Sequence, residues 1–332
     1  MTFDPELLIG ARNAVRVCLR IQAHEKVTLI TDHVSMEIAA AMEAALQEIG
    51  AQYHSFILED LAPRPMTDMP NQVLEDLESS QVSIFAVVAQ HNELHSRMQM
   101  TDVVNRRQVR HAHMVNIEKR IMLEGMRADY LAVDDLSVRL LEITRPAHRI
   151  RATTAAGTDI TAQMNPEYRW LKTSGIISPN TWGNLPGGEV WTTPGEVNGQ
   201  FVVDGVVGDY LCAKYGDLKA APLTLRIAGN RLREAHSDNK ALEDEFWRYT
   251  HTDENSDRVG EFAIGTNVGV KDVIGNILQD EKIPGVHIAF GNPYGDHTGA
   301  KWYSSTHIDV VGRRFSIWVD DRQIMRDGAF LL

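Results

Sequence analysis

In the first half of the chain, short apolar segments alternate with stretches whose apolar residues recur every three to four positions. The short segments predict strands and the periodic stretches predict buried helices. We expect helices at residues 5–23, 36–49, 71–78 and 102–108, and strands at 27–31, 52–58, 82–88 and 113–117. Because repeated strand–helix–strand units give a parallel sheet covered on both faces, this half is predicted to be an α/β domain.

Two features argue against nucleotide or nucleic-acid binding by such a domain. No Gly-x-Gly-x-x-Gly or phosphate-loop motif follows any of the expected strands, and that context is required for the nucleotide fingerprint. The formal net charge is -12, whereas binding to a phosphate backbone needs a basic surface. We therefore expect no nucleic-acid partner.

The pattern changes near Arg149. Residues 149–153 and 160–164, joined by the Gly-containing turn at 156–159, predict a hairpin. Further short strands are expected at 190–193, 200–203, 223–227 and 316–319, with one helix at 239–249. The second half is thus predicted to be a mostly antiparallel α+β domain. We place the domain boundary so that the α/β domain covers residues 1–148 and the second domain covers residues 149–332.

A cytoplasmic location is expected from three observations. The apolar runs are too short to span a bilayer. The first residues lack the basic and apolar regions of a signal peptide. Cys18 and Cys212 are the only cysteines, which is no disulfide framework and suits a reducing compartment.

Candidate metal ligands occur in the second half, at the ends of expected strands. His307 and Asp309 stand two residues apart, so a strand would direct both side chains to one side. His287 lies in the apolar run 286–290, Glu189 follows a Pro-Gly-Gly turn, and Glu261 lies in an apolar run beside Gly260. A carboxylate buried in such a run must be paired or bind a metal. Two histidines and three carboxylates without cysteine suit two divalent ions that share a carboxylate or a water, as in several aminopeptidases.

Each of these residues also has a purely structural explanation. Glu189 could be a surface turn residue, and Glu261 could pair with Arg258 or Lys282. His287 could be a hydrogen-bonded core histidine, and the His-x-Asp pair could be exposed on a strand without a metal. The hypothesis of a metal site therefore depends on the combination and not on any single member.

Four motifs together resemble the aminopeptidase T family, the thermophilic-type metal-dependent leucyl aminopeptidases. They are Asn184–Pro194, Gly260–Asn267, Glu281–Gly291 and His307–Asp309, and the segments 157–161 and 319–330 are also similar. The resemblance is specific over residues 150–332 and is only topological over the first half. Residues 302–306 differ from the run that usually precedes the His-x-Asp pair in that family.

The resemblance implies a function and a set of site residues. Two divalent metal ions, zinc, cobalt or manganese, are expected at the positions matching Glu189, Glu261, His287, His307 and Asp309. The position matching Tyr294 lies in the active site, where its hydroxyl is expected to donate a hydrogen bond to the oxyanion. The expected enzyme is a hydrolase, an aminopeptidase that cleaves a small peptide or a small-molecule amide by attack of metal-activated water. A homodimer with sites facing an enclosed cavity is also implied.

Two other functions remain open at this level. A related branch with the same fold, the 2,5-dihydroxypyridine dioxygenases, uses one iron, and His287, His307 and Asp309 alone could form a two-His-one-carboxylate iron site. The presence of both Glu189 and Glu261 favours the dinuclear hydrolase. A non-catalytic small-molecule-binding protein is disfavoured, because a pure binder has no need of all five ligands.

Overall fold

The computed structural model describes residues 2–179 and 183–332. The chain forms two compact units, Met1–Leu131 with Gly175–Gly187, and Ala132–Ser174 with Gly188–Leu332. The boundary expected from the sequence, between residues 148 and 149, follows the end of helix α7 (Tyr130–Thr144), whereas the two units divide within that helix. Each unit is described by itself.

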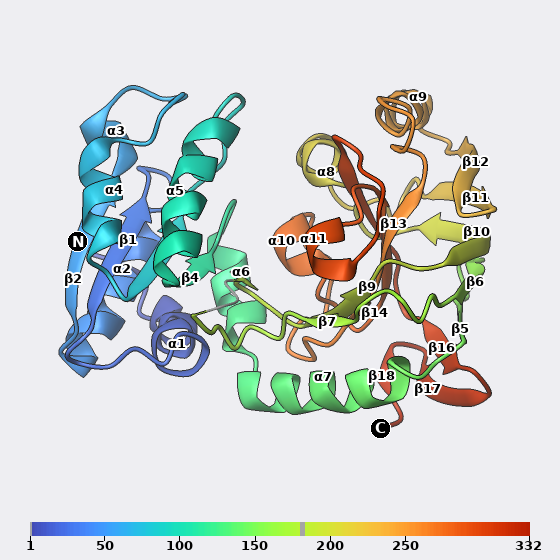
Figure 1. Ribbon diagram of the computed structural model, residues 1–332, viewed down its shortest axis with the longest axis horizontal. Coiled ribbons are helices and arrows are strands. Elements are labelled where there is room, and N and C mark those ends of the chain that lie inside the picture. Colours follow the sequence, from blue (N-terminus) through green and yellow to red (C-terminus); the bar gives the residue numbers. More distant parts are fainter. Residues whose placement is uncertain (1, 180–182) are drawn as a thin grey trace. The chain divides into compact units, whose positions relative to one another are not determined.

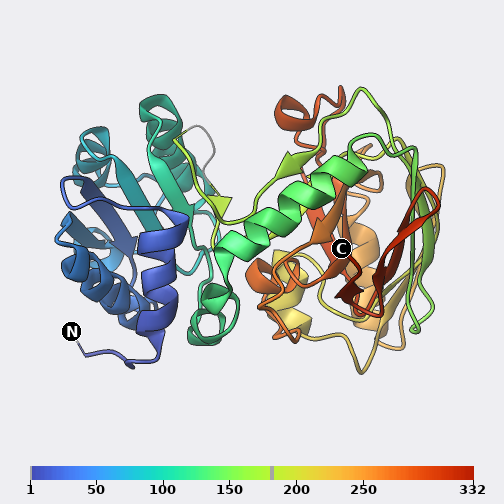
Figure 2. The same cartoon turned by 90° about the horizontal axis from the view of Figure 1, so that it is seen from below.

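The first unit contains a five-stranded parallel sheet with the order β2-β1-β3-β4-β8 (Figure 1). Its strands are β1 (Lys26–Thr31), β2 (Gln52–Ile57), β3 (Val82–Ala86), β4 (Arg110–His113) and β8 (Gly183–Asn184). Its helices are α1 (Leu7–Arg12), α2 (Met36–Ile49), α3 (Leu58–Leu61), α4 (Asn71–Glu78), α5 (Leu94–Arg107) and α6 (Lys119–Leu123), with a π-helix at Asn13–Cys18 and a 3-10 turn at Gly125–Arg127. Helices flank the sheet on both sides (Figure 2). The predicted α/β fold is thus confirmed.

Strand alternation decides which helices cover each face of this sheet. Ile30 of β1 and Phe85 of β3 pack with Val73 of α4 and Met100 of α5 in one apolar cluster. Leu29, the neighbour of Ile30, points to the opposite face because successive strand residues alternate, and it is also fully buried. Burial on both faces explains why these strands are apolar throughout instead of alternating.

Three elements in this unit differ by three residues or more from the sequence-based expectation. The helix expected at 5–23 is an α-helix that continues as a π-helix and ends at Cys18. The helix expected at 102–108 begins earlier, at Leu94. The strand expected at 113–117 is β4, at Arg110–His113. The polar residues of β4 concealed this strand in the sequence. His111 is nevertheless buried, because its ring nitrogen forms a hydrogen bond with the Ser83 hydroxyl.

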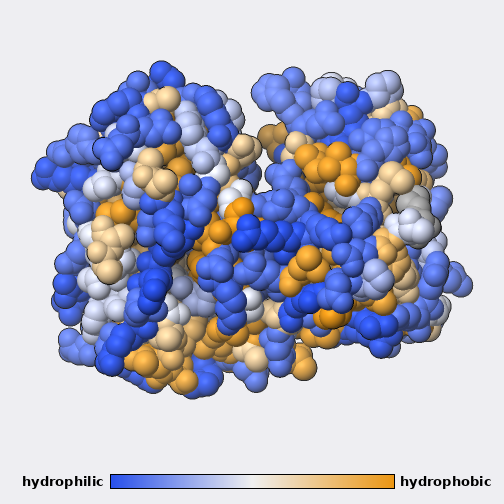
Figure 3. All heavy atoms as spheres, turned by 180° about the vertical axis from the view of Figure 1, so that it is seen from behind, coloured by the Kyte–Doolittle hydropathy of each residue, from blue (hydrophilic) through white to orange (hydrophobic). Residues whose placement is uncertain are grey.

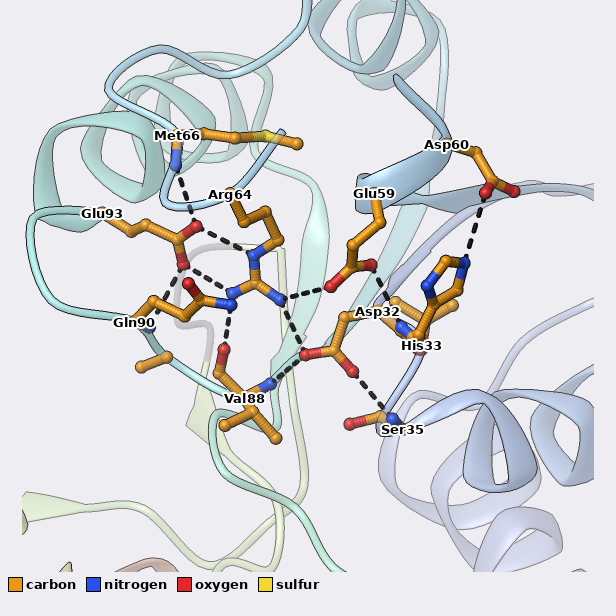
Figure 4. Close-up of polar contacts among 12 residues, drawn as sticks. Asp32, His33, Ser35, Glu59, Asp60, Arg64, Met66, Val88, Gln90 and Glu93 are labelled. Atoms are coloured by element: carbon orange, nitrogen blue, oxygen red, sulfur yellow. Dashed lines mark hydrogen bonds and ion pairs between the residues drawn. The ribbon is translucent and has the colours of Figure 1, made fainter. Parts of the chain in front are cut away.

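A buried arginine closes the carboxyl edge of this sheet (Figure 4). The Arg64 side chain is 3 % exposed, and its guanidinium contacts carboxylates of Asp32 at 2.9 Å, Glu59 at 3.1 Å and Glu93 at 2.5 Å. It also donates to the carbonyl of Val88 at 2.6 Å. Asp32, Glu59 and Val88 follow β1, β2 and β3 respectively, so one side chain connects the ends of three strands.

The second unit contains two antiparallel sheets (Figure 1). The eight-stranded sheet has the order β12-β11-β10-β6-β5-β16-β17-β18. Its strands are β5 (Arg149–Thr153), β6 (Asp159–Gln163), β10 (Glu196–Val203), β11 (Leu223–Ala228), β12 (Arg231–His236), β16 (Ser316–Val319), β17 (Arg322–Arg326) and β18 (Ala329–Phe330). The expected hairpin is present as β5 and β6, which pair from Arg149↔Gln163 to Thr153↔Asp159.

The five-stranded sheet of this unit has the order β15-β14-β13-β9-β7. Its strands are β7 (Leu171–Lys172), β9 (Glu189–Thr192), β13 (Val259–Gly265), β14 (Gly285–Gly291) and β15 (His307–Val311). The helices are α7, α8 (Asp209–Tyr215), α9 (Lys240–Tyr249), α10 (Ile277–Asp280) and α11 (Gly295–Thr298). The predicted mostly antiparallel α+β architecture is therefore confirmed, although α7 was not anticipated.

One apolar core joins the two sheets of the second unit. Phe201 and Leu225 from the eight-stranded sheet pack in the same cluster as Phe262, Ile288 and Ile308 from the five-stranded sheet. The face of the molecule drawn in Figure 3 is predominantly hydrophilic, as expected when apolar side chains gather inside. Among the described residues, no helix combines the length and apolar composition that crossing a membrane requires.

We predict that Arg64→Met strongly destabilises the first unit. The change leaves three carboxylates near strand ends without their cation, and breaking a buried ion pair typically costs about 3–5 kcal/mol. Urea unfolding followed by circular dichroism measures the loss. Arg106→Met is the matched control, because Arg106 pairs with Glu78 on the surface. Equal unfolding midpoints for the two variants would contradict a stabilising role of the Arg64 cluster.

Candidate metal centre

The five predicted ligands lie on four neighbouring strands of the five-stranded sheet. Glu189 begins β9, Glu261 is in β13, His287 is in β14, and β15 carries both His307 and Asp309. Each of the five directly precedes a residue of the apolar core; these core residues are Val190, Phe262, Ile288, Ile308 and Val310. Because strand residues alternate between faces, all five ligand side chains leave the sheet on the face opposite the core.

Small residues lie across from every candidate ligand. Glu261 and Asp309 both pair with Ala289, and His287 pairs with Ala263 on one side. Glu189 pairs with Gly265, and His307 pairs with Gly291. Cross-strand partners on one face have Cβ atoms about 4.5–5.5 Å apart. Small partners therefore leave room for the acidic and imidazole side chains to converge.

The ligand atoms form two groups that share Glu261. Glu261 Oε1 lies 3.5 Å from His287 Nε2, which is 3.4 Å from Glu189 Oε2. Glu261 Oε2 lies 3.6 Å from His307 Nε2, which is 3.4 Å from Asp309 Oδ1. Glu189, Glu261 and His287 thus form one candidate ion-binding group, and Glu261, His307 and Asp309 form a second.

These separations fit ligands of shared ions better than direct hydrogen bonds. Two atoms bound at about 2.0–2.2 Å to a tetrahedral ion are separated by about 3.3–3.6 Å. Glu189 Oε2 is buried and makes no hydrogen bond among the described residues, and only the ring of His287 lies beside it at 3.4 Å, so this oxygen remains open to a metal ion. His307 Nδ1 contacts the carbonyl of Asn292 at 3.0 Å, so Nδ1–H can donate there and leave Nε2 as the ligand atom.

The close spacing of acidic and imidazole groups shifts the pKa values of His307 and Asp309 in the metal-free protein. Burial alone would lower the pKa of His307, but Tyr294 and Asp309 outweigh it and raise that pKa well above its ordinary value. Burial alone would raise the pKa of Asp309, yet His307 holds it at about 2. In the metal-free protein the protonated histidines therefore balance the charge of the neighbouring carboxylates. Metal binding would displace the protons of these histidines.

The backbone conformation and the close approach of Asn267 require a glycine at position 188, directly before Glu189. Gly188 has φ +133°, and a Cβ at this position would lie 2.6 Å from the Cβ of Asn267. The Pro-Gly-Gly turn thus lets the chain pass Asn267 closely and enter β9 with Glu189 directed to the cluster.

Two functional candidates were missed by sequence reasoning, Glu281 and Lys282. Lys282 is 2 % exposed, and its ammonium lies 2.7 Å from Glu189 Oε1 and 2.5 Å from Glu281 Oε1. Glu281 also forms a candidate ion-binding group with His287 and Asp309. Burial raises the pKa of Glu281 to about 8, although Lys282 opposes the shift. An Asp-Glu-Lys run is typical of a solvated turn, so its position directly before the apolar run that holds His287 was the one signal that could have indicated a site.

Lys282 also orients Glu189. Glu189 Oε1 accepts hydrogen bonds from Thr173 at 2.7 Å and from Lys282, which leaves Oε2 directed at His287. Burial alone would raise the pKa of Glu189, but the charges of Lys282 and His287 outweigh it and lower that pKa. Glu189 is thus held ionised, and its Oε2 can bind a metal ion.

Tyr294 lies at the edge of this cluster. Its ring centroid is 4.6 Å from that of His307 and 6.0 Å from that of Trp191. Its backbone adopts the left-handed conformation with φ 48°, uncommon for an aromatic residue, and its amide donates to Asn292 Oδ1. Tyr294 is 40 % exposed, so its side chain is open to a small molecule.

The comparisons with known proteins show the family and the fold of this chain. A family model described as thermophilic metalloprotease (M29) matches residues 139–323. The fold is similar to that of wild-type AmpT from Thermus thermophilus, with a TM-score of 0.72, 16% identity and full coverage of both chains. It is also similar to that of 2,5-dihydroxypyridine dioxygenase from Pseudomonas putida KT2440, with a TM-score of 0.69, 14% identity, and coverage of 98% of this chain and 96% of that one. No curated protein sequence shows significant similarity to the chain.

We predict that the cost of Lys282→Met depends on metal. In the metal-free protein this change leaves Glu189 and Glu281 buried without their cation, which should cost about 3–5 kcal/mol of unfolding free energy. Divalent ions bound by Glu189 and lying near Glu281 would offset the charge of both acids, so the loss should shrink in the metal-loaded protein. Urea unfolding followed by tryptophan fluorescence measures both forms, because Trp170, Trp191 and Trp302 lie in this unit.

Lys214→Met is the matched control for Lys282→Met, because Lys214 pairs with Glu245 near the surface. Its effect should be small and independent of metal. If Lys282→Met destabilised both forms equally, its ammonium would not be a counter-ion to the metal-binding acids.

Proposed function

Because this chain belongs to the thermophilic metalloprotease (M29) family and is a metallopeptidase, we propose that it is a dinuclear aminopeptidase that releases N-terminal residues from short peptides. The observation that carries the proposal is the position of Glu261, whose two carboxylate oxygens face two different histidines. A carboxylate in that position can bridge two ions, and bridged pairs of ions recur in aminopeptidases.

The two groups of residues would hold one ion each. Glu189, Glu261 and His287 would bind the first, and Glu261, His307 and Asp309 would bind the second. Such ions, when bound, lower the pKa of water and polarise a carbonyl. Nitrogen and oxygen donors without cysteine suit zinc, cobalt or manganese.

The chain's own residues then supply proton transfer and orientation. Glu281, held by Lys282 through Oε1, would accept the proton of the attacking water on its other oxygen and pass it to the leaving amine. Tyr294 would donate its hydroxyl hydrogen to the oxyanion. An acid of the cluster would pair with the free amine of the substrate, which accounts for cleavage at the N-terminus.

The proposed assembly follows the family resemblance, and the proposed location follows the two cysteines and the short apolar runs of the sequence. We propose a cytoplasmic homodimer that acts on a small peptide or a small-molecule amide, with no nucleic-acid or membrane partner. A monomeric mass in light scattering at micromolar concentration would contradict the dimer.

We predict about two divalent ions per chain in the purified protein, and their loss on treatment with a chelator should abolish hydrolysis. His307→Ala should lower the metal content and abolish turnover of an aminoacyl-nitroanilide, because it removes a ligand, while circular dichroism stays unchanged. His236→Ala is the matched control, since His236 is exposed on β12.

Elemental analysis distinguishes the dinuclear hydrolase from the mononuclear iron dioxygenase. One iron per chain, with ring cleavage of a dihydroxypyridine and no peptidase activity, would favour the mononuclear dioxygenase. Full peptidase activity after complete removal of metal would place hydrolysis elsewhere.

We predict that Tyr294→Phe lowers kcat about 10²- to 10³-fold, because loss of one oxyanion donor has an effect of that size. Its metal content should stay unchanged, since Phe keeps the ring beside His307. Tyr303→Phe is the control, because Tyr303 is 70 % exposed in the loop before β15. Near-normal turnover of Tyr294→Phe would leave the tyrosine with a packing role only, and loss of metal would make it a ligand.

A further inference from the structure

We propose that Arg258 and Trp302 form a subsite for the carboxylate of the substrate beside the metal centre, which makes dipeptides the preferred substrate class. The inference rests on the proposed peptidase function and deepens it. It starts from two hydrogen-bond donors that the protein leaves without acceptors.

Arg258 is placed next to the candidate ligands by the backbone. It directly precedes β13, and its carbonyl accepts a hydrogen bond from Gly291 N at 2.8 Å, while Gly291 pairs with His307 on its other side. Arg258 and His307 therefore flank the end of β14, about two strand spacings or roughly 10 Å apart at their backbones.

The direction of the Arg258 side chain follows from the strand. Arg258 forms a β-bridge with Arg231, so the backbone is already extended there. Its neighbour Val259 points into the apolar core, which directs Arg258 to the opposite side. The register shift between Val259 and Glu261 then places Glu261 on that same side.

The guanidinium of Arg258 is half-buried and makes no hydrogen bond or ion pair with any residue in the described ranges 2–179 and 183–332. It lies 4.3 Å from the ring centroid of Trp302, which holds it in place. The indole Nε1 of Trp302 is buried and also has no partner among the described residues. The buried indole N–H is unfavourable without an acceptor, and the guanidinium beside it has no acidic partner among the described residues, so a ligand with an acceptor group would serve both donors.

The acids near Arg258 are engaged elsewhere. Asp257 pairs with Arg231. Asp253 accepts hydrogen bonds from Ser304 and Ser305. The pairing of Arg258 with Glu261 that the sequence left open does not occur, since both oxygens of Glu261 face the histidines. The protein therefore has not neutralised Arg258 with its own carboxylates.

A carboxylate is the group that best fits these donors. The planar guanidinium presents paired N–H groups that match two carboxylate oxygens, and it lies over the ring of Trp302. An extended dipeptide spans about 7 Å, at roughly 3.5 Å per residue. A peptide with its amine at the acid cluster can therefore present its carboxylate to Arg258 across the separation of roughly 10 Å, because the side chain of Arg258 covers the remainder.

Hydrolysis of Leu-Gly and of its C-terminal amide by the metal-loaded enzyme tests the subsite. For the wild type, kcat/KM should be about 10- to 100-fold higher for the acid than for the amide, because hydrogen bonds to a charged partner have that effect. Arg258→Met should remove this preference, because it raises KM for the acid far more than KM for the amide. Arg258→Lys should restore it in part. Arg233→Met, an exposed arginine on β12, is the matched control and should keep the full preference.

A binding measurement separates failure of the subsite from failure of the peptidase function. Isothermal titration of the metal-loaded protein uses a Leu-Gly analogue whose scissile carbonyl is replaced by a methylene, as the acid and as the amide. Weaker binding of the acid to Arg258→Met supports the subsite even if no peptide is cleaved. Equal kcat/KM for the acid and the amide in the wild type, or an unchanged preference or affinity in Arg258→Met, would overturn the proposal.

Discussion

The pleat of the five-stranded antiparallel sheet is the constraint on which the candidate site depends. In β9, β13, β14 and β15 every candidate ligand is followed by a core residue, so burial of the core face directs the ligands to the other face. A slip of one residue in any strand would bury the ligand in the apolar core and expose its neighbour. The registers that pack Phe262 and Ile288 are thus the same registers that bring Glu261 and His287 together.

Concentrated negative charge is the second constraint. Glu189, Glu261, Glu281 and Asp309 converge in a region with little access to water, and four carboxylates cannot stay ionised there without cations. Lys282 and the two histidines supply positive charge in the metal-free protein. Two divalent ions would replace the protons of the histidines, whereas Lys282 would stay between Glu189 and Glu281.

In the first unit, an internal side chain occupies the place where many parallel sheets bind ligands. The strand order β2-β1-β3 reverses direction between β1 and β3, and ligands of such sheets usually bind outside the carboxyl ends at that point. Here Arg64 connects Asp32, which follows β1, with the carbonyl of Val88, which follows β3 (Figure 4). This arrangement agrees with the missing phosphate-binding motif in the sequence, because Arg64 and its carboxylates already fill that edge.

The sequence by itself determined the fold class and the candidate ligands, because both depend on local periodicity. Alternation in the His307-x-Asp309 pair and the apolar runs around His287 and Glu261 are visible without any contact between segments. The β5–β6 hairpin was equally visible, since its turn chemistry is local. Only the tertiary structure decided that Glu261 faces both histidines, that Lys282 is a buried counter-ion, and that Arg258 has no acid partner. These facts depend on the pairing of strands far apart in the chain, and a charged residue has the same appearance in a sequence whether folding exposes it or buries it.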